Sequence, residues 1–139
     1  IKVDDLLRKE NLPVVSRGTI LKDAIIIMSQ GRLGSVIITD ENGKVFALLS
    51  DGDLRRALMN ENFSMDCKVE DIATINPKIL KNKELLASDA LQVIEDYKIQ
   101  LLIVTDENSK LVGVLHIHDL IEAGIKWSNK QKIKKKSHK

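Results

Sequence analysis

The sequence predicts an α/β (α+β) fold built from two copies of a β-α-β-β-α unit that pack with pseudo-two-fold symmetry. An internal repeat runs through almost the whole chain of 139 residues, and short aliphatic runs alternate with amphipathic segments in each copy. Hydrophobic residues make up 43% of the chain but aromatic residues only 3%, so the core must consist of aliphatic side chains. A chain of this length can form one ordinary domain or two small ones.

The repeat has an offset of 66 residues. The segment 37–44 (IITDENGK) recurs as 103–110 (IVTDENSK), and the same register pairs Asp53 with Asp119 and Lys2 with Lys68. A three-stranded sheet with helices on one face cannot bury its apolar surface alone, so we expect the two copies to pack together. We therefore divide the chain into a first repeat (residues 1–66), a second repeat (67–125) and a tail (126–139).

Each copy contains a short strand after a proline, an amphipathic helix, two strands joined by a polar turn and a final helix. Thr19 is expected to cap the first helix, and Gly124 to end the last one. In the first repeat, strands are expected at 14–15, 35–39 and 45–49, and helices at 20–30 and 51–59. In the second repeat, strands are expected at 78–80, 101–105 and 111–115, and helices at 85–97 and 117–123.

Charge and composition exclude several classes of protein. The tail carries seven lysines and no acidic residue; we expect a solvated, poorly ordered end, with contact to phosphates or an anionic membrane as the alternative. No apolar run is long enough to span a membrane, and few aromatic rings are available to stack on bases, so neither a membrane nor a nucleic acid is an expected partner. The single Cys67 predicts a reducing, cytoplasmic location and a packing role.

A related motif closes both repeats, where the last strand leads into the last helix. Residues 47–53 read ALLSDGD and residues 113–119 read GVLHIHD. Together with the order of elements, these motifs resemble the cystathionine β-synthase (CBS) domain, which occurs in tandem pairs known as Bateman modules. The ligand signature of that family is Gly, two apolar residues, Ser or Thr, two variable residues and Asp. The resemblance covers nearly all of residues 1–125 and implies a pair of CBS repeats with ligand clefts between them.

The resemblance also implies a set of ligand-binding residues. A hydroxyl and the N–H groups of a helix start can hold a phosphate, while a carboxylate accepts from both ribose hydroxyls; Ser50 and Asp53 supply these groups. In the second repeat Asp119 is retained, but His116 replaces the hydroxyl. By resemblance, a base would lie against residues 33–35, residues 16–19 would close the cleft, and Arg56 would reach an anionic group. The candidate ligand-binding residues are Ser16, Thr19, Leu33, Gly34, Ser35, Ser50, Asp51, Asp53, Arg56, His116, His118 and Asp119.

Two other interpretations of these motifs stay open. Ser50 and Asp53 also fit a helix-capping box, which would satisfy N–H groups without any ligand. His116, His118 and Asp119 combine imidazole and carboxylate groups that suit zinc. They straddle a strand-to-helix junction with no third histidine nearby, so we predict no metal site. No catalytic triad, P-loop or acid pair is visible, and no catalytic residue is expected in this chain.

The motifs at residues 49–56 and 113–124 are similar to the C-terminal part of arabinose-5-phosphate isomerases. These bacterial enzymes carry an N-terminal sugar isomerase (SIS) domain followed by a CBS pair. They interconvert ribulose 5-phosphate and arabinose 5-phosphate on the way to 3-deoxy-manno-octulosonate, a component of lipopolysaccharide or capsule. The resemblance implies that this chain, which begins at Ile1 rather than Met, is an excised regulatory fragment whose catalytic domain lies elsewhere in the parent.

This second resemblance extends to ligands and partners. It implies no required cofactor, an effector such as AMP, ATP or a CMP-linked sugar, and a homodimer that becomes a tetramer in the parent. A ligand-free dimerisation scaffold is one alternative. The other is the CBS pair of a different parent, such as a sugar nucleotidyltransferase or a transporter, because a fold does not determine a function.

Overall fold

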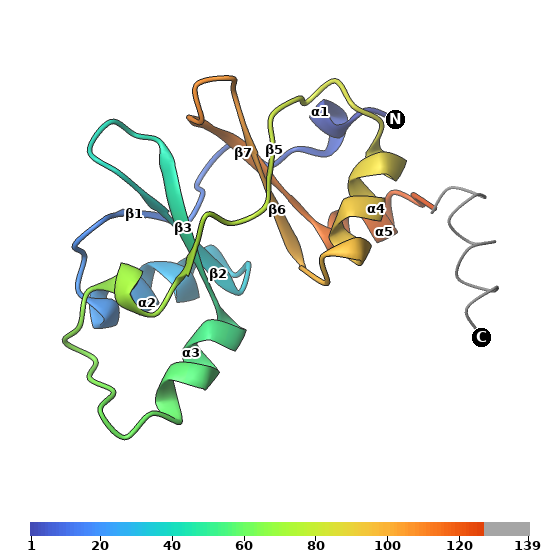
Figure 1. Cartoon of the computed structure of the whole chain (residues 1–139). Helices are drawn as coiled ribbons and strands as arrows, with labels where there is room; N and C mark the ends of the chain where they lie inside the picture. The colour runs from blue at the N-terminus through green and yellow to red at the C-terminus, as the bar shows by residue number, and fades with distance from the viewer. Residues whose placement is uncertain (127–139) are drawn as a thin grey trace.

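The structure is a computed structural model that describes residues 1–126, and it contains two β-α-β-β-α repeats whose sheets lie at the centre with helices outside them (Figure 1). The first repeat consists of β1 (Val14–Ser16), α2 (Leu21–Gly31), β2 (Ser35–Thr39), β3 (Val45–Ser50) and α3 (Asp51–Leu58). The second consists of β5 (Ile79–Leu80), α4 (Ala87–Asp96), β6 (Leu101–Thr105), β7 (Leu111–His116) and α5 (Ile117–Glu122). The predicted fold class is confirmed. Beyond Lys126, the predicted tail lies outside the described residues.

Each repeat forms a small mixed sheet. β1 pairs with β2 in parallel and β2 with β3 antiparallel, and β5, β6 and β7 reproduce this arrangement. The register shifts at the same place in both copies, between Ile38 and Thr39 and between Val104 and Thr105. The first sheet gains a fourth strand, β4 (Thr74–Ile75), antiparallel to β3. The sequence predicts only three strands, because a two-residue strand carries no periodicity of its own.

Helix α2 begins without a side-chain cap. Its N-cap residue is Ile20, so the expected capping role of Thr19 is wrong. The first helical N–H, that of Leu21, instead donates to the carbonyl oxygen of Cys67 at 2.8 Å. A backbone carbonyl from a distant segment therefore accepts from an N–H group at the start of α2. In helices with a side-chain cap, a nearby side chain accepts such a bond.

Two short segments cross from one repeat to the other. We call residues 2–8 the first crossing segment and residues 68–74 the second; they are equivalent under the 66-residue offset. They contain, respectively, α1 (Val3–Leu6), which lies beside α4 (Figure 1), and the 3₁₀ helix η1 (Val69–Asp71). The Val3 N–H donates to the Leu85 carbonyl and the Val69 N–H to the Thr19 carbonyl, both at 2.8 Å. Each repeat is thus completed by the segment that begins the other.

The core consists of three aliphatic clusters. One lies in each repeat, where Val3 is fully buried in the second and Val69 in the first. The third joins the two sheets and contains Leu33, Ile37, Leu101, Ile103 and Val114. Lys44 and Lys110, which are equivalent positions, form an isolated antiparallel bridge, so the pseudo-two-fold axis passes between them.

Two further features follow from the composition. Cys67 packs against the core of the first repeat, and burial raises the pKa of its thiol. The predicted packing role of Cys67 is thus confirmed. Within residues 1–126 no helix has the length and apolar character needed to cross a membrane.

Candidate functional site

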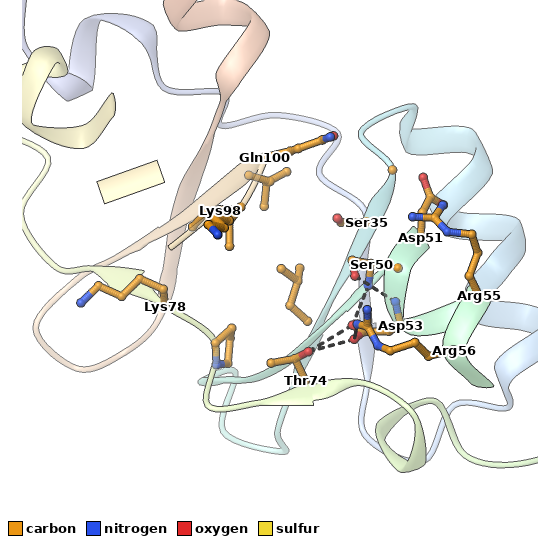
Figure 2. Close-up of a pocket in the computed structure, with 16 residues that line it drawn as sticks. Ser35, Ser50, Asp51, Asp53, Arg55, Arg56, Thr74, Lys78, Lys98 and Gln100 are labelled. Carbon is orange, nitrogen blue, oxygen red and sulfur yellow. Dashed lines mark hydrogen bonds and ion pairs between the residues drawn. The ribbon is translucent and has the colours of Figure 1, made fainter. Parts of the chain in front are cut away.

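A cavity of about 380 Å³ opens between the two repeats, at the point where β3 leads into α3 (Figure 2). We call residues 50–53 the first junction and the equivalent residues 116–119 the second junction. The cavity is lined by Gly34, Ser35, Leu48, Ser50, Asp51, Gly52, Asp53, Arg55, Arg56, Thr74, Pro77, Lys78, Lys98, Ile99, Gln100 and Leu101. It therefore combines the start of α3, the second crossing segment and the chain that leads into β6.

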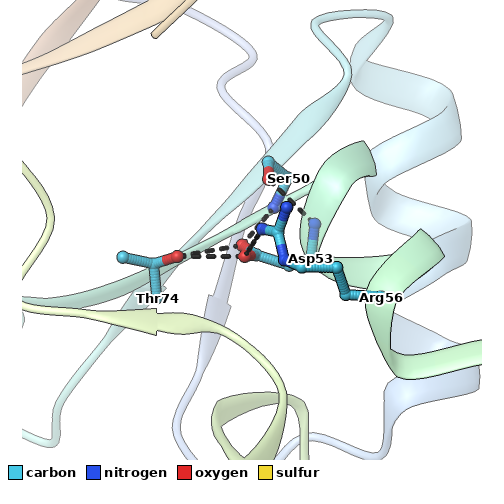
Figure 3. Close-up of polar contacts among 4 residues, drawn as sticks. All are labelled: Ser50, Asp53, Arg56 and Thr74. Atoms are coloured by element: carbon cyan, nitrogen blue, oxygen red, sulfur yellow. Dashed lines mark hydrogen bonds and ion pairs between the residues drawn. The ribbon is translucent and has the colours of Figure 1, made fainter. Parts of the chain in front are cut away.

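The first junction is a capping box. The Ser50 hydroxyl accepts from the Asp53 N–H at 3.2 Å, and the Asp53 carboxylate accepts from the Ser50 N–H at 3.0 Å (Figure 3). This reciprocal pair satisfies two donors that a helix start leaves free. It also fixes the Asp53 side chain at the cavity wall.

Asp53 has two further partners. Thr74 Oγ1 donates to its Oδ1 at 3.0 Å and lies 3.2 Å from Oδ2, while the Arg56 guanidinium donates to Oδ1 at 2.7 Å (Figure 3). The Asp53 side chain is only 7% exposed, whereas that of Arg56 is 72% exposed. Ion pairs with one partner in water are weak, so the guanidinium can exchange this carboxylate for another anion.

Positive charge prevails around the cavity. Arg55 and Arg56 extend from α3, and Lys78 and Lys98 lie on the opposite side (Figure 2). Arg56 already neutralises Asp53, so Asp51 is the one carboxylate in the lining of this cavity that no arginine holds. A concave site with surplus cations favours an anionic ligand.

Gly34 allows the loop before β2 to approach the first junction closely. Its φ is +71°, and its carbonyl accepts from the Asp51 N–H at 3.1 Å. A Cβ at this position would lie 3.1 Å from Asp51 Oδ2, tighter than ordinary van der Waals contact. The glycine thus allows the loop that precedes β2 to contact the start of α3.

Six of the twelve residues predicted from the sequence line this cavity: Gly34, Ser35, Ser50, Asp51, Asp53 and Arg56. Three others from the first repeat lie elsewhere. Leu33 packs between the sheets, Ser16 ends β1 in an exposed position, and Thr19 uses its carbonyl to hold the second crossing segment. His116, His118 and Asp119 form the second junction.

The second junction caps its helix differently. Nδ1 of His116 accepts from the His118 N–H at 3.2 Å, and the two imidazole rings stack with centroids 4.9 Å apart. Burial lowers the pKa of His116, with the neighbouring positive charges of His118 and Arg8 acting in the same direction and Asp119 opposing them. Within the described residues no group of three His, Cys, Asp or Glu side chains is arranged to hold a metal.

Asp119 is held by an arginine from the first crossing segment. Arg8 Nε donates to Oδ2 at 2.6 Å and Arg8 Nη2 to Oδ1 at 2.9 Å. The Arg8 guanidinium lowers the pKa of Asp119, and that carboxylate in turn raises the pKa of Arg8. A guanidinium that donates to both oxygens forms the strongest ion pair available to a carboxylate in a protein.

Six polar or charged contributors to these sites are absent from the sequence-based candidates: Arg55, Thr74, Lys78, Lys98, Gln100 and Arg8. The repeat offset could identify Lys98, because this residue is the counterpart of Arg32, which lies next to the predicted residues 33–35. Thr74 and Arg8 carry no local signal. Their roles depend on the crossing segments, which bring them to a junction in the other part of the chain.

Comparison with known proteins identifies the repeats. The CBS domain family matches residues 3–60 and again residues 69–126. CBSX2 in complex with AMP superimposes with a TM-score of 0.77 over 88% of this chain and 95% of that one, at 24% identity. A CBS domain protein from Pyrobaculum aerophilum complexed with AMP gives 0.76 over 86% and 90%, at 22% identity.

Curated relatives are longer proteins. An uncharacterized protein of Helicobacter pylori strain J99 is 46% identical over 126 residues, and arabinose 5-phosphate isomerase KdsD of Pseudomonas aeruginosa is 38% identical over 126 residues. These alignments cover 91% and 90% of this chain but 38% of each relative, so the chain spans well under half of their length. Two complete family matches in tandem, on the expected fold, show that this chain belongs to the CBS domain family.

Proposed function

We propose that this CBS pair is the regulatory and oligomerising module of an arabinose-5-phosphate isomerase and that it binds a nucleotide or nucleotide-sugar effector in the cavity at the first junction. One observation carries the ligand proposal. The buried carboxylate of Asp53 faces a cavity between the repeats that four cationic side chains border. Carboxylate acceptors beside clustered cations match a molecule that has both hydroxyl donors and phosphate.

The chemistry of a nucleotide divides between the two walls. Ribose hydroxyls would donate to Asp53 in place of the Thr74 hydroxyl or the Arg56 guanidinium. A displaced guanidinium would then be free to hold a phosphate. At the start of α3 the N–H groups of Asp51 and Asp53 already donate to Gly34 and Ser50, so the N–H of Gly52 would be the backbone donor to a phosphate. Lys98 adds positive charge from the second repeat. AMP, ATP and a CMP-linked sugar acid all carry these groups.

A ligand in this cavity would contact both repeats. The first junction belongs to one repeat, whereas Lys98 and Gln100 precede β6 of the other (Figure 2). An effector that binds one relative orientation of the repeats more tightly shifts the population towards it, and an attached enzyme domain senses that shift. The similarity to KdsD of Pseudomonas aeruginosa supports an isomerase as the attached domain, and the AMP complexes of the structural neighbours support a nucleotide.

Isothermal titration tests the ligand proposal. AMP, ATP, CMP and the CMP-activated octulosonate are titrated into this chain and into Asp53→Ala and Asp119→Ala, a matched pair at equivalent positions. We expect saturable binding of at least one compound, lost in Asp53→Ala and retained in Asp119→Ala. Absence of binding to the folded protein would contradict the proposal.

A ligand-free scaffold is the second candidate, and the capping box favours it. Ser50 and Asp53 already satisfy each other, so they have a structural role without any ligand. In that case saturating nucleotide leaves the Tm unchanged, while sedimentation still shows the proposed homodimer. The parent is tested by assaying the complete natural protein for interconversion of ribulose 5-phosphate and arabinose 5-phosphate.

A further inference from the structure

The two junctions receive a side chain from equivalent positions of the crossing segments. Thr74 reaches Asp53 and Arg8 reaches Asp119, and both pairs of positions obey the 66-residue offset. The same place in the fold therefore carries a neutral hydroxyl at one carboxylate and a guanidinium at the other.

The backbone follows the same path at both places. Thr74 pairs with Leu48 at the edge of the first sheet, and Arg8 pairs with the equivalent Val114 at the edge of the second. The Arg8 N–H donates to the Val114 carbonyl and the Val114 N–H to the Arg8 carbonyl, each at 2.9 Å. The difference between the junctions thus comes from the side chains and not from the course of the chain.

Arg8 uses the acceptors that a ligand would need. It donates to both oxygens of Asp119, at 2.6 and 2.9 Å, so a pair of ribose hydroxyls would replace two charged donors by two neutral ones. At Asp53 the crossing segment supplies only one hydroxyl hydrogen. The charged donor comes from Arg56, which bonds a single oxygen and whose side chain is 72% exposed, against two oxygens and 48% for Arg8, so Arg56 can turn to a phosphate more readily. His116 also stands where Ser50 offers a hydroxyl.

We propose that Arg8 occupies the carboxylate of the second junction, Asp119, as an internal substitute for a ligand, so that the chain takes up one effector molecule, at Asp53, and the residue at the end of each crossing segment decides which junction accepts a ligand. This inference rests on the proposed function, because it assumes that the junction carboxylate is the acceptor of the ligand. To the proposed function it adds the number of effector molecules bound per chain and the residue that determines this number.

The test exchanges the two crossing residues. AMP and CMP are titrated separately into the unaltered chain, Arg8→Thr, Thr74→Arg and the double exchange, with Asp53→Asn and Asp119→Asn in each background. We expect one molecule per chain in the unaltered protein and two in Arg8→Thr, the second lost with Asp119→Asn. Thr74→Arg should weaken binding at Asp53 roughly tenfold or more. In the double exchange, binding should move from Asp53 to Asp119.

Each failure has a distinct meaning. If the unaltered chain binds at Asp53 and Arg8→Thr adds no second molecule, the inference is wrong and the proposed function stands. Two molecules per chain in the unaltered protein also overturn it. If the unaltered chain binds neither probe but Arg8→Thr binds through Asp119, Arg8 does mask that carboxylate, but the predicted uptake of one molecule at Asp53 is wrong and the proposed function fails with it. Binding in no variant refutes both. Arg8→Gln, which keeps the length of the side chain and removes its charge, serves as the second variant if Arg8→Thr does not fold.

Discussion

The junction between β3 and α3 and the junction between β7 and α5 occupy equivalent places in the fold and share an aspartate, yet the groups around that aspartate differ. Ser50 and Asp53 form a reciprocal capping box, whereas His116 caps α5 through Nδ1 and leaves Asp119 to an arginine. The backbone tolerates both arrangements, because the paired strands beside each junction have the same register and each repeat buries an equivalent valine from a crossing segment. Duplication therefore explains the architecture, and individual side chains set the polar contacts of each junction.

The largest difference in stability between variants at equivalent positions should appear at Gly113, the counterpart of Ala47. A Cβ at Gly113 would collide with the carbonyl oxygen of Arg8 and lie 2.7 Å from Cγ of Leu7. In the first repeat the equivalents of Gly113 and Leu7 are Ala47, a core residue, and Ala73, which packs against the same core. We expect Gly113→Ala to lower the free energy of unfolding by about 3 kcal/mol, as overpacking of a core does. Urea denaturation measures it.

The reverse change supplies the control for this comparison. Ala47→Gly removes a buried methyl group and should cost about 1 kcal/mol. The double variant Gly113→Ala, Leu7→Ala has alanine at both positions, as the first repeat does at Ala47 and Ala73. Its loss of unfolding free energy should be smaller than the sum of the losses in the two single variants. Strict additivity would show that Leu7 is not the obstacle.

The crossing segments should contribute equally to the two repeats. Val3 and Val69 are both fully buried at equivalent positions, each in the core of the other repeat. Replacing either by alanine deletes two methyl groups and leaves a cavity, which should lower the free energy of unfolding by about 2 kcal/mol. Urea denaturation of both variants tests the symmetry. A much smaller loss for Val3→Ala would mean that the first crossing segment frays from the second repeat.

The sequence predicts the elements that depend on local signals and misses those that depend on distant ones. Residue periodicity and the 66-residue offset predict the strands around Ile37 and Ile103 and the helices that precede them. Strand β4 and the crossing of residues 2–8 are missed because their pairing partners lie in another part of the chain. The start of α2 is misplaced for the same reason, since the carbonyl of Cys67 replaces a local cap.

The candidate site shows the same division. Ser50, Asp53 and Arg56 lie within the N-cap and the first two turns of α3, so a motif suffices to predict that they act together. Arg8 is 111 positions from Asp119, and nothing in its own surroundings in the sequence marks it as the partner of that carboxylate. Only the folded path of the first crossing segment shows it.

The capping box should make a moderate contribution to stability. Ser50→Ala removes the oxygen that accepts from the Asp53 N–H, and loss of such a cap lowers the free energy of unfolding by about 1 kcal/mol. Ser50→Thr, which keeps the hydroxyl, should cost clearly less. Thermal unfolding of both variants at neutral pH measures the difference. Equal losses in the two variants would mean that the hydroxyl does not cap α3.

The smallest predicted effect concerns the pH dependence that the histidine cap introduces into the second junction. Burial lowers the pKa of His116 below its ordinary value of 6.5, so the unfolded chain binds this proton more readily than the folded one. His116 therefore contributes a loss of stability as the pH falls below 6.5, while its effect is absent above that value. Protonation of Nδ1 would also remove the acceptor for the His118 N–H. His116→Ser, which installs the cap of the first repeat, should flatten this part of the curve of unfolding free energy between about pH 8 and pH 5, whereas the control His118→Gln should retain most of the slope. An unchanged slope in His116→Ser would assign the acid sensitivity to groups outside the second junction.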